Sequence, residues 1–138
     1  MIENRSDRAT AELEQLWRRI VFSVLISNTD DHLRNHGFLH QHDDTWNLSP
    51  AFDLNPNPEP GATTLSTAID VSDDTASIEL TLAVAPAFRL VRAQARAILS
   101  EVATAVSAWR SVAARHGLNT SEITTMAPAF SALDDLAT

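Results

Sequence analysis

Residues 11–38, AELEQLWRRIVFSVLISNTDDHLRNHGF, join a segment of regularly spaced apolar residues to a dense group of polar ones. In residues 11–26 the apolar side chains recur every three or four positions, which is the period of an α-helix buried along one face. We expect a helix here, capped by Thr10 or Asp7 and ended by the turn-forming residues 27–30. Its apolar positions are Leu13, Leu16, Trp17, Ile20, Val21, Val24 and Leu25.

The rest of the sequence predicts one mainly α domain over residues 1–138 that contains a single small β-hairpin. Residues 38–48 hold two short apolar segments around a polar turn and predict this hairpin. Prolines at positions 50, 56, 58 and 60 then favour a long irregular loop, followed by at most one short strand near Ile69. Further helices are expected over residues 78–85, capped by Ser77 and ended by Pro86, over residues 92–116, and from Thr120 or Ser121 through Phe130.

Composition narrows the range of functions. The 138 residues contain ten cationic side chains, all of them arginine, against 18 acidic ones, and the formal net charge is -8. A broad surface for nucleic acid or anionic membrane is therefore not expected. Cysteine is absent from the sequence, which excludes disulfides and thiolate metal sites. Because no apolar run approaches the roughly 20 residues of a membrane span, we expect a soluble, cytoplasmic protein.

The polar residues 28–36 are the best candidates for chemistry. Asp30 and Asn35 are five positions apart, the spacing of the aspartate and asparagine in a protein-kinase catalytic loop. There the aspartate accepts the proton of the substrate hydroxyl and the asparagine helps to hold Mg²⁺. Asp53, beyond the expected hairpin, is placed to be a second magnesium ligand. From Asp31 the asparagine is only four positions away, so Asp30 is the preferred base and Asp31 a supporting or surface carboxylate.

Two other interpretations remain open at this stage. Asp30 and Asn35 could simply form a helix end and turn whose side chains bond their own backbone. Nearby histidines could instead hold a transition metal in a hydrolase, although their spacing fits no common zinc pattern and two of them would share a solvent-facing side of the hairpin. These histidines are His32, His36, His40 and His42.

Two longer stretches, NTDDHLRNHGF at residues 28–38 and WNLSPAFDLNP at residues 46–56, carry a specific similarity. Together they resemble the C-terminal half of the HipA family of serine/threonine kinase toxins. Shorter similarities continue along the chain, so the resemblance covers nearly all of it. These are Leu65-Ser66, Trp109-Arg110, Val112-Ala113 and Met126-Ala127-Pro128-Ala129-Phe130.

The resemblance implies a protein-kinase-like C-lobe, mainly helical, with the small hairpin at the catalytic loop. It implies that Asp30 is the catalytic base and His32 a supporting residue of that loop. It also implies that Asn35 and Asp53 bind Mg²⁺ and, through the metal, ATP. A protein substrate and a helix-turn-helix antitoxin are the partners that the resemblance implies, with no direct contact to nucleic acid or membrane.

The nucleotide-binding half of such a kinase is not found in the sequence. Protein kinases hold the phosphates of ATP with a strand lysine and a glycine-rich loop. This sequence has no lysine, and its three glycines, at positions 37, 61 and 117, form no such loop. We therefore expect a kinase lobe without its amino-terminal nucleotide lobe, weakly active or inactive alone unless a separately encoded lobe completes it. The alternative is a non-catalytic lobe that binds an antitoxin-like protein.

Overall fold

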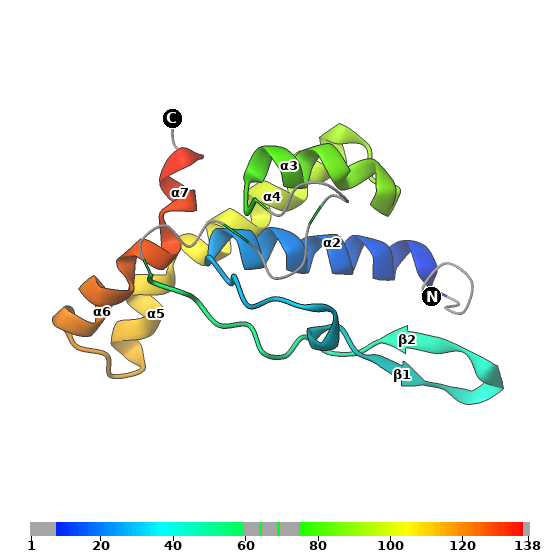
Figure 1. Cartoon of the computed structure of the whole chain (residues 1–138), viewed down its shortest axis with the longest axis horizontal. Coiled ribbons are helices and arrows are strands. Elements are labelled where there is room, and N and C mark those ends of the chain that lie inside the picture. The colour runs from blue at the N-terminus through cyan, green and yellow to red at the C-terminus, as the bar shows by residue number, and fades with distance from the viewer. Residues whose placement is uncertain (1–7, 60–63, 65–68, 70–74, 137–138) are drawn as a thin grey trace.

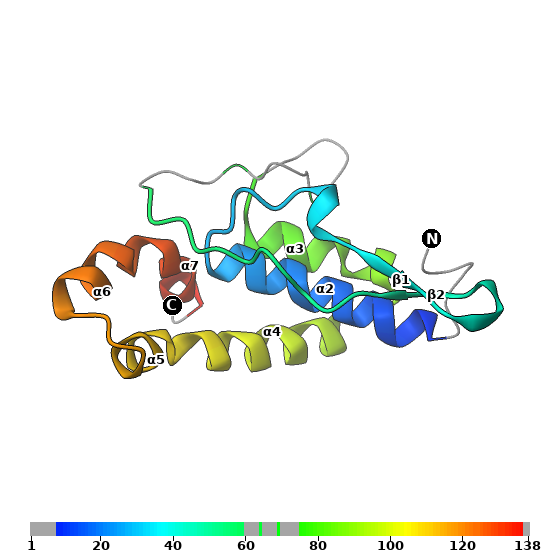
Figure 2. The ribbon, with the colours of Figure 1, turned by 90° about the horizontal axis from the view of Figure 1, so that it is seen from below.

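Helix α2 (Ala9–Leu25) is the centre of the fold, and several of the other elements pack against it. The structure is a computed structural model that describes residues 8–59, 64, 69 and 75–136. Figures 1 and 2 show α3 (Ile78–Val84) and α4 (Arg92–Ser107) against α2, with the small β-hairpin along another side of the same helix. This arrangement confirms the predicted fold class of a mainly α domain with one hairpin. Within the described ranges, no helix is long and apolar enough to cross a membrane.

The buried face of α2 forms the core that the apolar spacing predicts. Trp17, Val21 and Leu25 are at most 1% exposed, and they pack against a row of apolar side chains on α4 that includes Ile98. The indole N–H of Trp17 donates a hydrogen bond to the backbone oxygen of Thr81, at 3.1 Å. A buried indole needs such a partner, so the contact also fixes α3 against α2.

Two predictions concern the cap of α2 and a short strand near Ile69. Thr10 lies inside α2 rather than at its cap, because the helix begins at Ala9 after Arg8, which makes no side-chain capping bond. Asp7, the other candidate cap, lies outside the described residues. Ile69 lies in a bend, and most of the neighbouring residues on which a short strand would depend are also outside the description.

Helix α3 has the cap that the sequence predicts. The Ser77 hydroxyl oxygen accepts a hydrogen bond from the backbone N–H of Leu80, at 3.0 Å. The helix then passes into a 3-10 turn, η3 (Ala85–Phe88), which contains Pro86 near its start. Proline is tolerated there because the first residues of a helix need no backbone donor.

The prediction of a single helix over residues 92–116 is wrong. The chain turns at Ala108 and forms two helices, α4 and α5 (Trp109–Arg115). The Ser107 hydroxyl donates to the backbone oxygen of Thr104 at 2.7 Å, a local bond that bends helices. Beyond the bend, the Trp109 ring stacks on Phe130, with the ring centroids 4.0 Å apart. This stacking on Phe130 is a tertiary contact, and the local sequence around Trp109 does not reveal it.

The C-terminal region is a series of short helices. Gly117 has a φ of 91° and ends α5. Helix α6 (Thr120–Met126) starts where expected, but its cap is Asn119, whose side chain accepts the N–H groups of Ser121 and Glu122. A 3-10 turn η4 (Ala127–Phe130) and helix α7 (Ala132–Asp135) follow, so the predicted last helix is divided.

A small hairpin lies beside α2, on which its second strand packs. Strands β1 (Phe38–His40) and β2 (Trp46–Leu48) pair antiparallel, with Phe38 opposite Leu48, around a 3-10 turn η2 (His42–Asp44). Residues 49–59 then run without regular structure, as the prolines predict. This irregular segment runs back toward the loop that follows α2 (Figure 1).

Candidate functional site

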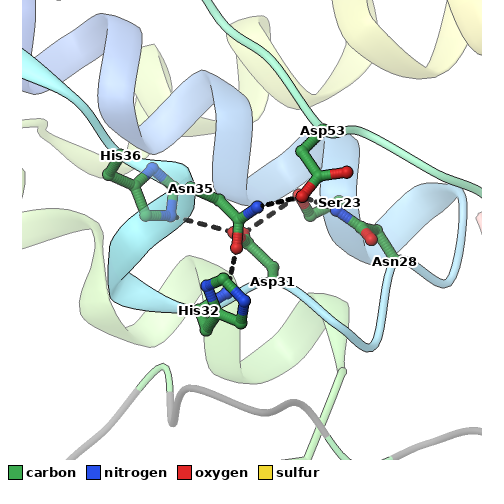
Figure 3. Close-up of polar contacts among 7 residues, drawn as sticks. All are labelled: Ser23, Asn28, Asp31, His32, Asn35, His36 and Asp53. Atoms are coloured by element: carbon green, nitrogen blue, oxygen red, sulfur yellow. Dashed lines mark hydrogen bonds and ion pairs between the residues drawn. The ribbon is translucent and has the colours of Figure 1, made fainter.

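The loop after α2 folds back onto the last turns of the helix. The backbone N–H of Asn28 donates to the backbone oxygen of Ser23, at 2.8 Å, and Ser27 adopts a positive φ of 50° to make this turn. Asn28 is 2% exposed, and its amide nitrogen lies 3.5 Å from the Ser23 hydroxyl. The start of the loop is therefore fixed to a rigid helix (Figure 3).

Asn35 and Asp53 meet across 18 positions of sequence. The amide nitrogen of Asn35 donates to Oδ2 of Asp53 at 2.6 Å, as Figure 3 shows. Asn35 ends a short 3-10 turn, η1 (Leu33–Asn35), and its Oδ1 accepts the backbone N–H of His32 at 3.0 Å. Asn35 is 5% exposed, whereas Asp53 is exposed and has a φ of 57°. The predicted pair of magnesium ligands is thus brought together, with the carboxylate open to solvent.

Two asparagines that the sequence analysis missed connect this segment further. Asn55 donates from Nδ2 to Oδ1 of Asp53 at 2.9 Å, so each oxygen of that carboxylate accepts one amide hydrogen bond. Asn57 donates to the hydroxyl oxygen of Thr29, also at 2.9 Å, and so joins the segment to the residue before Asp30. Their signal in the sequence was only the repeat of asparagine at alternate positions after Asp53, which is common in loops.

The neighbouring carboxylates Asp30 and Asp31 have opposite environments. Asp30 is exposed and has no hydrogen-bond or ion-pair partner within the part of the chain that the structure describes. Asp31 is 8% exposed; it accepts the Ser23 hydroxyl at 3.2 Å, and its other oxygen lies 3.0 Å from Nε2 of His36. Asp31 is therefore an internal carboxylate that supports the loop, and the surface position considered for it is wrong.

The histidines do not form a metal cluster. Among the described residues there is no group of three or more histidine, cysteine or acidic side chains that could hold a metal ion. His40 packs edge-on against Trp46, with ring centroids 5.0 Å apart, and His42 lies in the η2 turn rather than on a strand. His32 lies in the loop as expected, and its ring nitrogen Nδ1 is buried without a hydrogen-bond partner in the described structure. Its contact with Asn35 comes from its backbone instead.

Arg19 is a further residue that the sequence analysis did not select. It is 7% exposed on α2, and its Nη2 donates to the backbone oxygen of Ser49, just after strand β2. Burial removes water from the guanidinium and lowers the pKa of Arg19 below its usual value. The burial of Arg19 could not be recognised from helical spacing, because Arg18 and Arg19 are adjacent arginines of the same helix and Arg18 is only partly buried.

The donor groups of Asn35 and Asp53 fit a magnesium ion. Mg²⁺ prefers oxygen ligands, keeps several waters and is commonly held by one or two carboxylates together with substrate phosphates. Asp53 offers an exposed carboxylate, and the Asn35 amide oxygen keeps a second lone pair beyond the one used by His32. Asp30, exposed in the same loop, can accept a proton or a hydrogen bond from a hydroxyl.

The chain is similar to known proteins over the region that contains the candidate site. A family model described as HipA-like C-terminal domain matches residues 1–109, which include the whole candidate site. A protein of Sinorhizobium fredii named "Putative kinase Y4dM" is 44% identical over 48 residues. That similarity covers 35% of this chain and 12% of the Sinorhizobium protein.

Proposed function

Because the chain belongs to the HipA-like C-terminal domain family, we propose that it supplies the base and the magnesium ligands of a protein serine/threonine kinase. The observation that carries the proposal is the 2.6 Å hydrogen bond from the Asn35 amide nitrogen to the Asp53 carboxylate, which brings two side chains with oxygen ligands together across 18 positions. Asp30 lies in the loop that Asn35 ends, so three residues of a phosphoryl-transfer site occupy one region. Such sites act mainly by positioning and by electrostatic stabilisation.

In the proposed mechanism, Asp30 orients the hydroxyl of a protein substrate and accepts its proton. Asn35 and Asp53 would hold Mg²⁺, which when bound would supply neutralising charge for the phosphates of ATP. The His32 backbone N–H orients the Asn35 amide, and Asn55 orients the Asp53 carboxylate. Asp31 fixes the loop from inside through Ser23 and His36.

Groups that hold the nucleotide would come from elsewhere. The 138 residues contain no lysine, and a planar arginine guanidinium does not place charge as a compact ammonium does. We therefore propose that a nucleotide-binding lobe, in another segment or a separate polypeptide, completes the site in the cytoplasm. A helix-turn-helix antitoxin is the regulatory partner that membership of this family suggests.

The proposal is tested by supplying the missing lobe. The 138-residue chain is mixed with the amino-terminal portion of a longer HipA-like kinase, Mg²⁺ and γ-labelled ATP, and label transfer to protein is measured. We expect transfer that depends on this chain and that Asp30→Asn abolishes. Asp44→Asn is the matched control, because Asp44 is an exposed carboxylate in the turn of the hairpin. Equal transfer by both variants would exclude Asp30 as the base.

A binding role without catalysis is the second candidate, and the apolar surface near the site favours it. Leu33 and Phe52 are 77% and 46% exposed, and they are close in sequence to Asn35 and Asp53. Large exposed apolar side chains often mark protein contacts. If the added lobe binds this chain and Leu33→Ser weakens that binding, while no transfer is ever seen, the binding role is correct and the kinase proposal fails.

A further inference from the structure

Arg19 lies on the side of α2 that faces the Asp53 segment. Its side chain is 7% exposed, and its one hydrogen bond goes to the backbone oxygen of Ser49. Two other nitrogens, Nε and Nη1, are buried without a hydrogen-bond partner in the described residues, and no acidic side chain of those residues pairs with the guanidinium. A buried cation without a counter-charge is costly, so Arg19 is poorly explained as a stabilising residue.

Apolar packing does not fill the space between the Asp53 segment and the helices. Between α2, α4 and this segment lies an open cavity of about 340 Å³, with Ala51 and Leu54 on one side and Phe22 and Val102 on the other. A cavity removes the van der Waals contacts that would otherwise fix a segment against the helices. The segment is instead held by polar contacts: Asp53 and Asn57 bond the loop after α2, and the contact from Arg19 to Ser49 bonds the start of the segment to α2 itself.

Ser49 is where the segment leaves the hairpin. Its backbone N–H donates to the backbone oxygen of Gly37 at 2.9 Å, while its own backbone oxygen accepts from Arg19. The same helix that carries Arg19 also carries Ser23, which holds the catalytic loop through Asp31. One rigid helix is thus bonded to both halves of the candidate site.

We propose that Arg19 is a positioning residue that sets the Asp53 carboxylate at the correct distance from Asn35. The inference rests on the proposed magnesium-binding role of these two residues. It adds a part of the site that lies outside the catalytic loop, on the preceding helix. Arg19 acts through the backbone of Ser49 and has no contact with the reacting groups.

The test compares Arg19→Met and Arg19→Lys with wild type, using the complete 138-residue chain. Arg18→Met is the matched control, since the partly exposed Arg18 pairs, among the described residues, with the exposed carboxylates of Glu14 and Glu101 and not with Ser49. Hydrogen–deuterium exchange is followed over residues 49–55, and Mn²⁺ binding is measured by electron paramagnetic resonance as a probe for Mg²⁺. We expect Arg19→Met to speed exchange over this segment and to weaken Mn²⁺ binding about tenfold or more, the usual effect of losing an outer-shell partner.

The conservative variant and the melting temperature separate positioning from general stability. Arg19→Lys retains one donor for Ser49 and should restore part of the Mn²⁺ affinity. Loss of affinity at an unchanged melting temperature supports positioning, whereas a parallel fall in melting temperature with faster exchange throughout the chain would reduce Arg19 to a structural residue. Unchanged exchange over residues 49–55 in Arg19→Met overturns the inference. If wild type binds no Mn²⁺, the proposed function fails, and the exchange comparison still decides the role of Arg19.

Discussion

The contrast between Asp30 and Asp31 gives the sharpest prediction about stability. Replacing Asp31 by alanine removes the acceptor of the Ser23 hydroxyl bond at 3.2 Å and the partner of His36 at 3.0 Å. A hydrogen bond to a charged group contributes about 1.5–3 kcal/mol, and the substitution also removes the close His36 contact, so we expect a loss of about 3 kcal/mol in the free energy of unfolding. Asp30→Ala removes an exposed carboxylate without a partner among the described residues and should change this free energy by less than about 0.5 kcal/mol.

Urea unfolding measures both variants. The fluorescence of fully buried Trp17 reports the transition, with changes at Trp46 and Trp109 adding to it. With a slope of about 1.5–2 kcal/mol per molar urea, Asp31→Ala should lower the midpoint by roughly 1.5–2 M and Asp30→Ala should leave it in place. The reasoning is refuted if the two variants unfold at the same urea concentration, or if Asp30→Ala is the less stable one.

Three further substitutions test the fold around the site. Trp17→Ala empties a position that is 0% exposed and should cost about 3–5 kcal/mol, measured by thermal unfolding; a cost under 1 kcal/mol would contradict the assigned core. Gly117→Ala should cost about 1–2 kcal/mol in the same assay, because φ is 91° there, although the added Cβ would lie in open space with respect to the described residues; a neutral result would show that the turn relaxes. Gly37→Ala would place a Cβ 3.0 Å from the Ser49 hydroxyl, so we expect a loss of about 1 kcal/mol in the free energy of unfolding and weaker Mn²⁺ binding at Asp53. Unchanged Mn²⁺ binding would show that the contact between Gly37 and Ser49 does not affect the site.

The elements that the sequence predicts correctly are those that depend on neighbouring residues alone. The apolar spacing that includes Trp17 and Val21 predicts α2, because one helical face must be buried. Ser77 predicts the start of α3 for an equally local reason, a side-chain oxygen that accepts a backbone N–H of the first turn. The bend at Ala108 was missed, because neither glycine nor proline marks it and Trp109 meets its stacking partner Phe130 only in the folded chain.

In the candidate site, too, some residues could be predicted from the sequence and others could not. Spacing and the hairpin predicted that Asn35 and Asp53 would meet, and they do. The burial of Asp31 was not predicted, because adjacent aspartates look alike in sequence and only the return of the loop onto α2 distinguishes them. Arg19 could not be identified either, since its role depends on a backbone oxygen 30 positions away. Side chains that act through tertiary contacts to backbone leave no pattern in the sequence.

A Mn²⁺ titration of the 138-residue chain, followed by electron paramagnetic resonance, tests the central claim most directly, because Mn²⁺ shares the oxygen preference of Mg²⁺. Asn35 and Asp53, whose side chains are joined by a 2.6 Å hydrogen bond from Nδ2 to Oδ2, are proposed to form one divalent-cation site. We expect a single site that Asp53→Ala abolishes, that Asn35→Ala weakens about tenfold, and that Asp44→Asn leaves unchanged. Binding that is absent in wild type, or equally strong in Asp53→Ala, would contradict the account.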